Sequence, residues 1–366
     1  MIGDKCPLGA QENPHAQSGL CGWAIARHNR RVTTTHRPAA LGSLPADLQA
    51  SLPSTPISLT KAGVTRSAKS IRITHGGDER LFHAEVECHV DLDPRQKGVH
   101  MSRFEEVVNE AIDEVVIGEA LVIEALAERI AQCVVARQAA LRSEVTIRAS
   151  YPVERRTPVT DIPTQEMYGL IGIAAATSSA TRRLVGVSAQ GMNACPCAQG
   201  LIRDQAEAAL RDDGFDEADI MRIVAHVPIA THNQRARGTL LVGTSDRIVP
   251  AETLIAIVED GMSSEIYELM KRPDEQFVVA KAHSRPRFVE DSVREMVRGV
   301  IERLPDLPDD AFIHAHQVNF ETIHTHDVEA ERSATLGEVR AELGGVRPGA
   351  RHTTLQMWLA AAHVGA

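Results

Sequence analysis

The strongest constraint on the fold of this chain is a strictly alternating stretch from Leu81 to Leu92. An apolar period of two places all the apolar side chains on one face of a β-strand and the polar side chains on the other. The stretch therefore predicts a strand with one buried face, which a second layer must cover. The apolar positions are Phe82, Ala84, Val86, Cys88, Val90 and Leu92, and the polar positions are His83, Glu85, Glu87, His89 and Asp91.

The order of predicted elements then recurs in a second half of the chain. Two strand-like stretches precede a helical region in each half, so we predict an α+β fold with antiparallel sheets and helices packed on one face. Strands are predicted at residues 71–74, 81–92, 144–149, 168–176, 184–190, 239–242, 277–283 and 312–323. Helices are predicted at residues 102–140, 198–225, 251–270 and 289–304.

The two ends of the chain lack such periodicity. Residues 1–44 are predicted to be a flexible N-terminal leader, and residues 344–366 a loosely ordered C-terminal tail. Residues 1–68 carry seven basic and three acidic residues, a net charge of +4. Because the whole chain carries −10, the remainder carries −14. A basic, proline-containing leader on an acidic body is typical of a flexible tail.

Composition excludes several classes of protein. A net charge of −10 argues against nucleic-acid binding, which needs clustered Lys and Arg. The sequence contains no run of 18 apolar residues, so no membrane span is predicted, and its first residues show no secretory signal pattern. The six Cys residues lack the spacing of a disulfide framework, which favours a reducing cytoplasm. The 16 His residues direct attention to metal binding or proton transfer.

The densest chemical signal is the run from Asn193 to Cys197, in which two thiols flank Pro196. A short ring strains a disulfide between such neighbours. At a strand-to-helix junction, the helix dipole favours the thiolate form, which suits a metal ligand or a nucleophile. Taken alone, the run is equally compatible with two small buried residues at a tight turn.

Other candidates are weaker one by one. His232, in the run Thr-His-Asn-Gln-Arg, could be a structural histidine, and the run from Lys271 to Glu275 could be a solvated turn whose proline ends a helix. His324 and His326 would point to the same face of a strand, as would the pair His314 and His316. Together, one Cys, one His and one Glu with an open position would form a catalytic metal site for Zn, Fe(II) or Mn(II).

Several motifs in one order make the chain resemble the type IB GTP cyclohydrolases of bacteria and their archaeal Fe(II)-dependent relatives. The resemblance covers about residues 45 to 343. The motifs are Lys97-Gly98-Val99-His100-Met101-Ser102-Arg103-Phe104, Asn193-Ala194-Cys195-Pro196-Cys197, Thr231-His232-Asn233-Gln234-Arg235, Lys271-Arg272-Pro273-Asp274-Glu275, Arg287-Phe288-Val289-Glu290-Asp291 and Ile323-His324-Thr325-His326.

The resemblance implies a tunnelling fold of two ββααββ modules, residues 45–160 and 161–343. It also implies a homo-oligomer, expected to be a tetramer, with active sites at subunit interfaces. It implies Cys195, His232 and Glu275 as metal-site residues. It further implies catalytic roles for Cys197, His324 and His326, and a purine-anchoring role for Glu290.

The implied activity is hydrolysis of GTP at C8 of guanine with loss of formate, a step that begins pterin and tetrahydrofolate biosynthesis. A carboxylate at Glu290 can accept hydrogen bonds from guanine N1–H and its 2-amino group, a donor pair that adenine lacks. Local basic and polar groups must bind the triphosphate. The candidates are Lys97, His100, Ser102, Arg103 and Arg235.

The resemblance does not decide between two possible products of the reaction. The bacterial branch of the resembled family releases 7,8-dihydroneopterin triphosphate, which we favour from the composition. The archaeal branch gives the 2′,3′-cyclic phosphate, and the long helical insertion between Cys197 and His232 resembles that branch. A thiol-dependent nitrile reductase on the same fold and a non-catalytic purine-binding protein are the competing functions.

Overall fold

The computed structural model describes residues 47–75, 78–114, 123–245, 247–347, 349 and 352–360. The predicted leader, residues 1–44, lies outside the described residues. Residues 47–366 belong to one compact unit.

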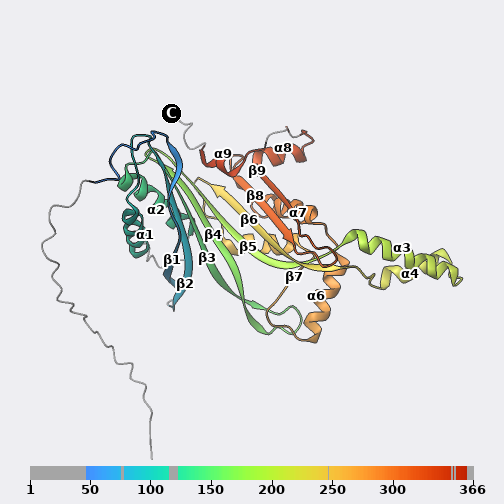
Figure 1. Ribbon diagram of the computed structural model, residues 1–366. Helices are drawn as coiled ribbons and strands as arrows, with labels where there is room; N and C mark the ends of the chain where they lie inside the picture. The colour runs from blue at the N-terminus through green and yellow to red at the C-terminus, as the bar shows by residue number, and fades with distance from the viewer. Residues whose placement is uncertain are drawn as a thin grey trace, which may run out of the picture. The chain divides into compact units, whose positions relative to one another are not determined.

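Nine strands of the described residues form one antiparallel sheet, shown in Figure 1. The order is β1-β2-β3-β4-β5-β6-β8-β9, and the short β7 pairs with β5. The alternating stretch from Leu81 to Leu92 lies in β2, so that strand prediction is confirmed. The strands are β1 (Leu59–His75), β2 (Asp78–Leu92), β3 (Arg142–Arg156), β4 (Pro163–Thr177), β5 (Thr181–Ala194), β6 (Asn233–Thr244), β7 (Ser264–Glu265), β8 (Phe312–Asn319) and β9 (Val328–Thr335).

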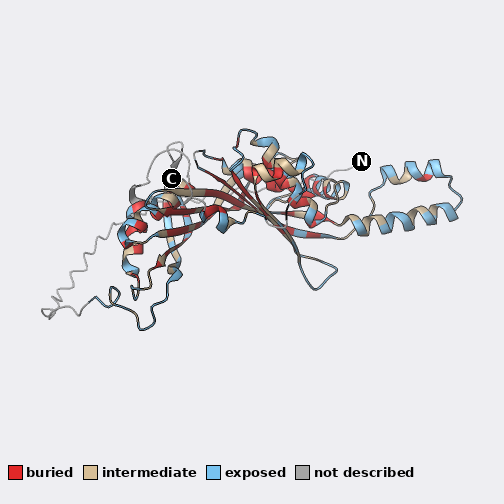
Figure 2. Ribbon diagram, turned by 90° about the horizontal axis from the view of Figure 1, so that it is seen from above, coloured by how far each residue is buried: buried red, intermediate tan, exposed pale blue. Residues whose placement is uncertain are grey.

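Helices cover one face of the sheet. Helix α2 packs on β3 and β4, α5 on β5 and β6, and α7 on β8 and β9. Figure 2 shows buried residues along these helices and the strands beneath them. The helices are α1 (Met101–Glu114), α2 (Ile123–Gln138), α3 (Pro196–Asp212), α4 (Glu217–His226), α5 (Ala251–Gly261), α6 (Arg272–Ser284), α7 (Val289–Arg303), α8 (Leu336–Leu343) and α9 (Leu355–Ala360).

The α+β class with an antiparallel sheet is therefore confirmed, whereas the tunnelling fold and its two modules stay predictions. Helix α7 coincides with the helix predicted at residues 289–304. None of the described helices is long and apolar enough to cross a membrane.

The face opposite these helices carries a second, smaller core. Val185 on β5 belongs to the main core, and its neighbour Leu184 belongs to the second cluster, because successive side chains of a strand point to opposite faces. Helix α9 covers that cluster with Trp358 and Leu359. This helix lies within the segment 344–366 that was predicted to be loosely ordered. The second cluster contains Ala175, Leu184, Leu241, Phe312, Trp358 and Leu359.

Two predicted elements of the second half are wrong. Residues 277–283, predicted as a strand, lie in helix α6. The proline in that region does not end a helix: Pro273 lies in the first turn of α6, where its missing N–H costs nothing. The helix predicted at residues 251–270 ends at Gly261, and the chain then forms β7.

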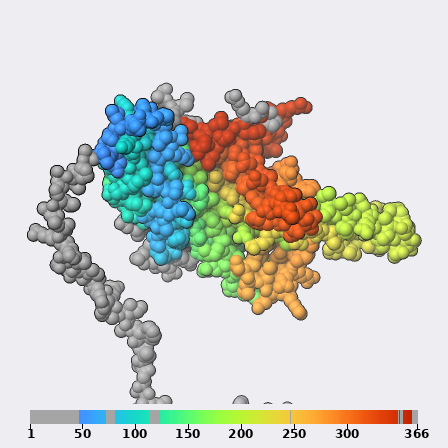
Figure 3. Space-filling view, viewed as in Figure 1, coloured from blue at the N-terminus to red at the C-terminus, as the bar shows by residue number. Residues whose placement is uncertain are grey.

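The insertion between Cys197 and His232 is helical, as predicted, but it forms two helices and not one continuous stretch. Helix α3 has no buried residue, and α4 buries only Ile220. Figure 3 shows both helices standing out from the body of the unit. The insertion therefore adds exposed helical surface to the loop that follows β5, and hardly any core.

Candidate functional site

The Cys195 turn lies between β5 and α3, at the strand-to-helix junction that the sequence predicts. Cys195 is the N-cap of α3, and its Sγ accepts a hydrogen bond from the amide of Ala198 at 3.5 Å. Pro196 occupies the first turn, and Cys197 is exposed there. Both cysteines therefore lie at the N-terminus of α3, where backbone amides lack helical partners. Both thiols are free.

His232 lies beside this turn. Its carbonyl accepts a hydrogen bond from the Cys195 amide at 3.1 Å, and the hydroxyl of Thr231 donates to the Cys195 carbonyl at 2.6 Å. The predicted neighbours Cys195 and His232 are therefore brought together by the pairing of β5 with β6. The His232 Nδ1 atom lies 3.1 Å from Gln234 Oε1, which orients the ring.

Glu321 is a functional candidate that sequence reasoning missed. Its carboxylate is 7% exposed and lies 3.8 Å from His232 Nδ1, and its Oε1 accepts a hydrogen bond from the Gln234 side chain at 3.2 Å. A buried carboxylate beside an imidazole is a typical partner for a metal ligand or a proton carrier. The available signal was an acidic residue in the same short run as His324 and His326.

Glu275 is not brought to this pair within the described residues. It lies exposed in the first turn of α6, where its amide donates to the Lys271 carbonyl. Its neighbour Asp274 is fully buried instead. The Asp274 carboxylate accepts hydrogen bonds from the amides of Val159, Thr160 and Lys271 and from the Thr160 hydroxyl. Asp274 therefore fixes the start of α6 against the β3–β4 turn.

We expect Asp274→Asn to lower the Tm at pH 7 by about 5 °C, because an amide cannot accept all four bonds. These bonds hold the pKa of Asp274 well below its ordinary value. A lowered folded-state pKa gives stability that is present above the unfolded value, about 3.9, and is lost as pH falls toward the folded value.

The Tm difference between wild type and Asp274→Asn should thus be constant from pH 5 to 8 and shrink below about pH 4. Differential scanning calorimetry across this range measures it. Asp216→Asn, which changes the exposed N-cap of α4 to an equally good cap, is the matched control and should shift the Tm little. A difference as large at pH 3 as at pH 7 would contradict the assignment.

His324 and His326 do not lie in a strand. Strand β8 ends at Asn319, and both histidines lie exposed in the connection to β9. Their rings nevertheless stack, with centroids 5.1 Å apart and planes at 16°. The Thr322 hydroxyl donates to the Asn233 carbonyl at 3.1 Å, and Glu321 turns inward toward His232. These contacts draw the chain away from strand geometry.

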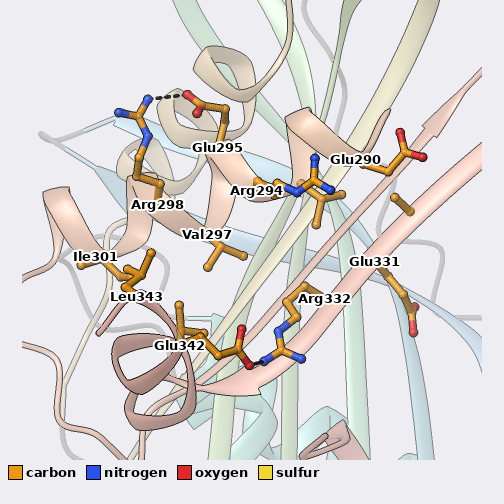
Figure 4. Close-up of a pocket in the computed structure, with 13 residues that line it drawn as sticks. Glu290, Arg294, Glu295, Val297, Arg298, Ile301, Glu331, Arg332, Glu342 and Leu343 are labelled. Atoms are coloured by element: carbon orange, nitrogen blue, oxygen red, sulfur yellow. Dashed lines mark hydrogen bonds and ion pairs between the residues drawn. The ribbon is translucent and has the colours of Figure 1, made fainter. Parts of the chain in front are cut away.

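Glu290 lies exposed in the first turn of α7 and lines a pocket of about 530 Å³ between α7, β9 and α8, shown in Figure 4. The volume falls in the usual range for ligand pockets. Arg332 pairs with Glu342 and Arg298 with Glu295 around it, so these two arginines are already neutralised. The pocket is lined by Glu290, Val293, Arg294, Glu295, Val297, Arg298, Ile301, Ala330, Glu331, Arg332, Val339, Glu342 and Leu343.

The residues predicted to bind the triphosphate of GTP fall into two groups. Lys97, His100, Ser102 and Arg103 gather at the start of α1, where His100 Nε2 lies 3.2 Å from Asp47. In the described part of the chain, no contact joins them to the Cys195 turn. Arg235 is on β6, donates to the Gln190 side chain, and lines a separate pocket of about 250 Å³.

The donor types suit a divalent metal ion, but their geometry is incomplete. The backbones of Cys195 and His232 are hydrogen-bonded, and the Glu321 carboxylate lies 3.8 Å from His232 Nδ1, so thiol, imidazole and carboxylate residues occupy one region. Across the residues that the structure describes, however, no three His, Cys, Asp or Glu side chains lie close enough to hold an ion. Within the described part of one chain, these candidate ligands therefore lie in one region but do not form a complete metal site.

Comparison with known sequences decides the family. The sequence model described as "Type I GTP cyclohydrolase folE2" matches residues 46–330. The chain belongs to this family. The prediction of a GTP cyclohydrolase is thereby confirmed at the level of the family.

Similar curated relatives of this type I GTP cyclohydrolase folE2 member come from methanogenic archaea, and each is named GTP cyclohydrolase MptA. The relative from Methanococcus aeolicus is 41% identical over 305 residues, which cover 81% of this chain and 99% of the relative. Those from Methanothermobacter thermautotrophicus and Methanoregula boonei are 38% and 40% identical, covering 81% and 83% of this chain and 95% of each relative. Uricase from Arthrobacter globiformis has a TM-score of 0.48 at 10% identity, covering 81% of this chain and 96% of the uricase.

Proposed function

We propose that this folE2-type cyclohydrolase hydrolyses GTP at C8 of guanine, opens the imidazole ring and releases formate. The observation that carries the proposal is that a chain of this family joins Cys195 to His232 by a backbone hydrogen bond and places the Glu321 carboxylate 3.8 Å from the His232 ring. These residues come from three separate runs of the sequence, and strand pairing assembles them at one end of β5 and β6.

We further propose a divalent ion, Fe(II), Mn(II) or Zn(II), with Cys195 and His232 among its ligands and a carboxylate from Glu321 or Glu275. A divalent ion lowers the pKa of water and so supplies a nucleophile near neutral pH. Glu321 can hold a proton or orient His232, because its carboxylate is buried and 3.8 Å from the ring. The stacked His324 and His326 rings are exposed and can exchange protons with ring nitrogens of a bound purine.

Glu290 is the proposed anchor for guanine. Glu290 is exposed and lines a 530 Å³ pocket, so its carboxylate can accept from guanine N1–H and the 2-amino group. Adenine presents no such donor pair, so ATP should be a poor substrate.

The cyclic phosphate fits the comparisons better than the triphosphate that the sequence composition favoured. The relatives at about 40% identity are archaeal proteins named MptA, and the α3–α4 insertion resembles the archaeal branch. We therefore propose 7,8-dihydroneopterin 2′,3′-cyclic phosphate as the product.

A tunnelling-fold homo-oligomer, such as a tetramer, would complete the sites at subunit interfaces. The outer strands of the described sheet carry opposite charge, which supports edge-to-edge assembly. Strand β1 carries Lys61, Arg66, Lys69 and Arg72 and no acidic residue, whereas β9 carries Glu329 and Glu331 against one basic residue, Arg332.

The test uses the full chain purified without oxygen and freed of metal with a chelator. We expect the protein to be inactive until Fe(II), Mn(II) or Zn(II) is restored, and then to release formate from GTP and not from ATP. Mass spectrometry of the pterin distinguishes the cyclic phosphate from the triphosphate. No formate with any of these ions would overturn the proposed activity.

A further inference from the structure

Asn193 is fully buried, and its side chain makes three hydrogen bonds to two other segments of the chain. Its Nδ2 donates to Ser292 Oγ at 2.9 Å and to the Arg287 carbonyl at 3.4 Å. Its Oδ1 accepts from the Ser263 amide at 3.1 Å. Asn193 thus uses both donors and its acceptor, and none of these bonds is within its own strand.

The neighbouring backbone strengthens the same junction. The Ser263 hydroxyl accepts a bond from the Ala194 amide at 3.1 Å, and the Arg287 amide donates to the Ala194 carbonyl at 2.9 Å. Residues 193 and 194 therefore join the end of β5 to the segment after α5 and to the start of α7. Cys195 follows immediately on one side of the junction.

Ser292 connects the junction to the proposed purine anchor. It is fully buried on α7, two residues after Glu290, and its Oγ also donates to the Phe288 carbonyl at 3.4 Å. One amide side chain therefore fixes both the strand end that carries Cys195 and the helix start that carries Glu290. A shift in this contact changes the separation of the two.

We propose that Asn193, through Ser292, is a positioning residue that sets the distance between the Cys195 turn and the Glu290 carboxylate. The inference rests on the proposed function, in which Glu290 holds the base and the Cys195 turn lies by the reacting C8. Misplacing a reacting atom by about 1 Å can cost about 10²-fold in rate. The base contact itself stays intact, so the loss falls on kcat and leaves KM nearly unchanged.

The test compares Ser292→Ala with Ser143→Ala in the full, metal-loaded chain. Ser143 is a matched control: it is 1% exposed, and its hydroxyl donates one bond at 2.7 Å that ties β3 to the Ala131 carbonyl of α2. Ser292→Ala loses the bond from Asn193 and the longer bond to the Phe288 carbonyl, and Ser143→Ala loses its one bond to Ala131, so we expect both variants to have a lower Tm. We expect Ser292→Ala to lower kcat for GTP about 10-fold with KM within about twofold, and Ser143→Ala to change neither.

A double-mutant cycle adds a second measurement. If Asn193 acts through Ser292, Asn193→Ala and Ser292→Ala together should lower kcat by less than the product of their separate effects. If Asn193→Ala fails to fold, the comparison of Ser292→Ala with Ser143→Ala still tests the positioning role. A kcat for Ser292→Ala equal to that of Ser143→Ala would overturn the positioning role alone. A wild-type chain that neither binds nor turns over GTP would overturn the proposed function, and this role with it.

Discussion

Cys195→Ser should abolish formate release from GTP, with kcat lowered by at least about 10³-fold. The substitution removes the thiolate and keeps a side chain of almost the same size. Serine is among the best N-cap residues, so α3 should begin at the same place and the Tm should change little. The activity loss would therefore report chemistry at the sulfur atom and not loss of the fold.

The matched control is Cys133→Ser. Cys133 is a free, partly buried thiol on α2, packed against the main core and on a helix of the first half of the chain. Its replacement should leave kcat within about twofold. Formate assay and metal content, measured on both variants, separate the outcomes, because Cys195→Ser should also retain less metal. Turnover by Cys195→Ser within tenfold of the wild type would sink the assignment of this sulfur to the site.

Local periodicity predicted the elements whose burial is decided nearby in the chain. Strand β2 alternates cleanly because one face lies on the core, and α7 shows its helical period because one stripe packs on β8 and β9. Helix α6 has no comparable signal. Its run from Phe277 to Ala280 suits a strand equally well, and the start of the helix is decided by Asp274 through bonds to Val159 and Thr160.

The candidate site also contains residues that local sequence could predict and residues that it could not. The proximity of Cys195 and His232 could be predicted, because each lies in a distinctive run of polar or sulfur side chains beside a strand terminus. Glu321 was not, since its role depends on a contact with His232 formed across the pairing of β6 with β8. The residues predicted to bind the triphosphate show a different limit of local sequence. Four of them lie together at the start of α1, beside the first strands of the sheet: Lys97, His100, Ser102 and Arg103.

Trp358→Ala should lower the free energy of unfolding by about 3 kcal/mol, which is the usual cost of removing a buried large aromatic side chain. Trp358 is 3% exposed, stacks on Phe312 with centroids 5.6 Å apart, and donates its indole N–H to the Asp310 carbonyl at 2.8 Å. The Arg182 guanidinium lies 4.5 Å from its ring centroid. Gly243 makes room for it, because a Cβ there would lie 2.6 Å from the ring.

The variant uncovers the second apolar cluster, since α9 holds to the sheet chiefly through this side chain and Leu359. Met357→Ala is the control, because Met357 is on the same helix and 55% exposed, so its loss should cost less than about 0.5 kcal/mol. Urea unfolding at one fixed protein concentration measures both, since assembly would make apparent stability depend on concentration. Gly243→Ala should destabilise in the same direction by forcing the ring away from β6. Equal unfolding midpoints for Trp358→Ala and Met357→Ala would mean that α9 does not hold this face of the sheet in solution.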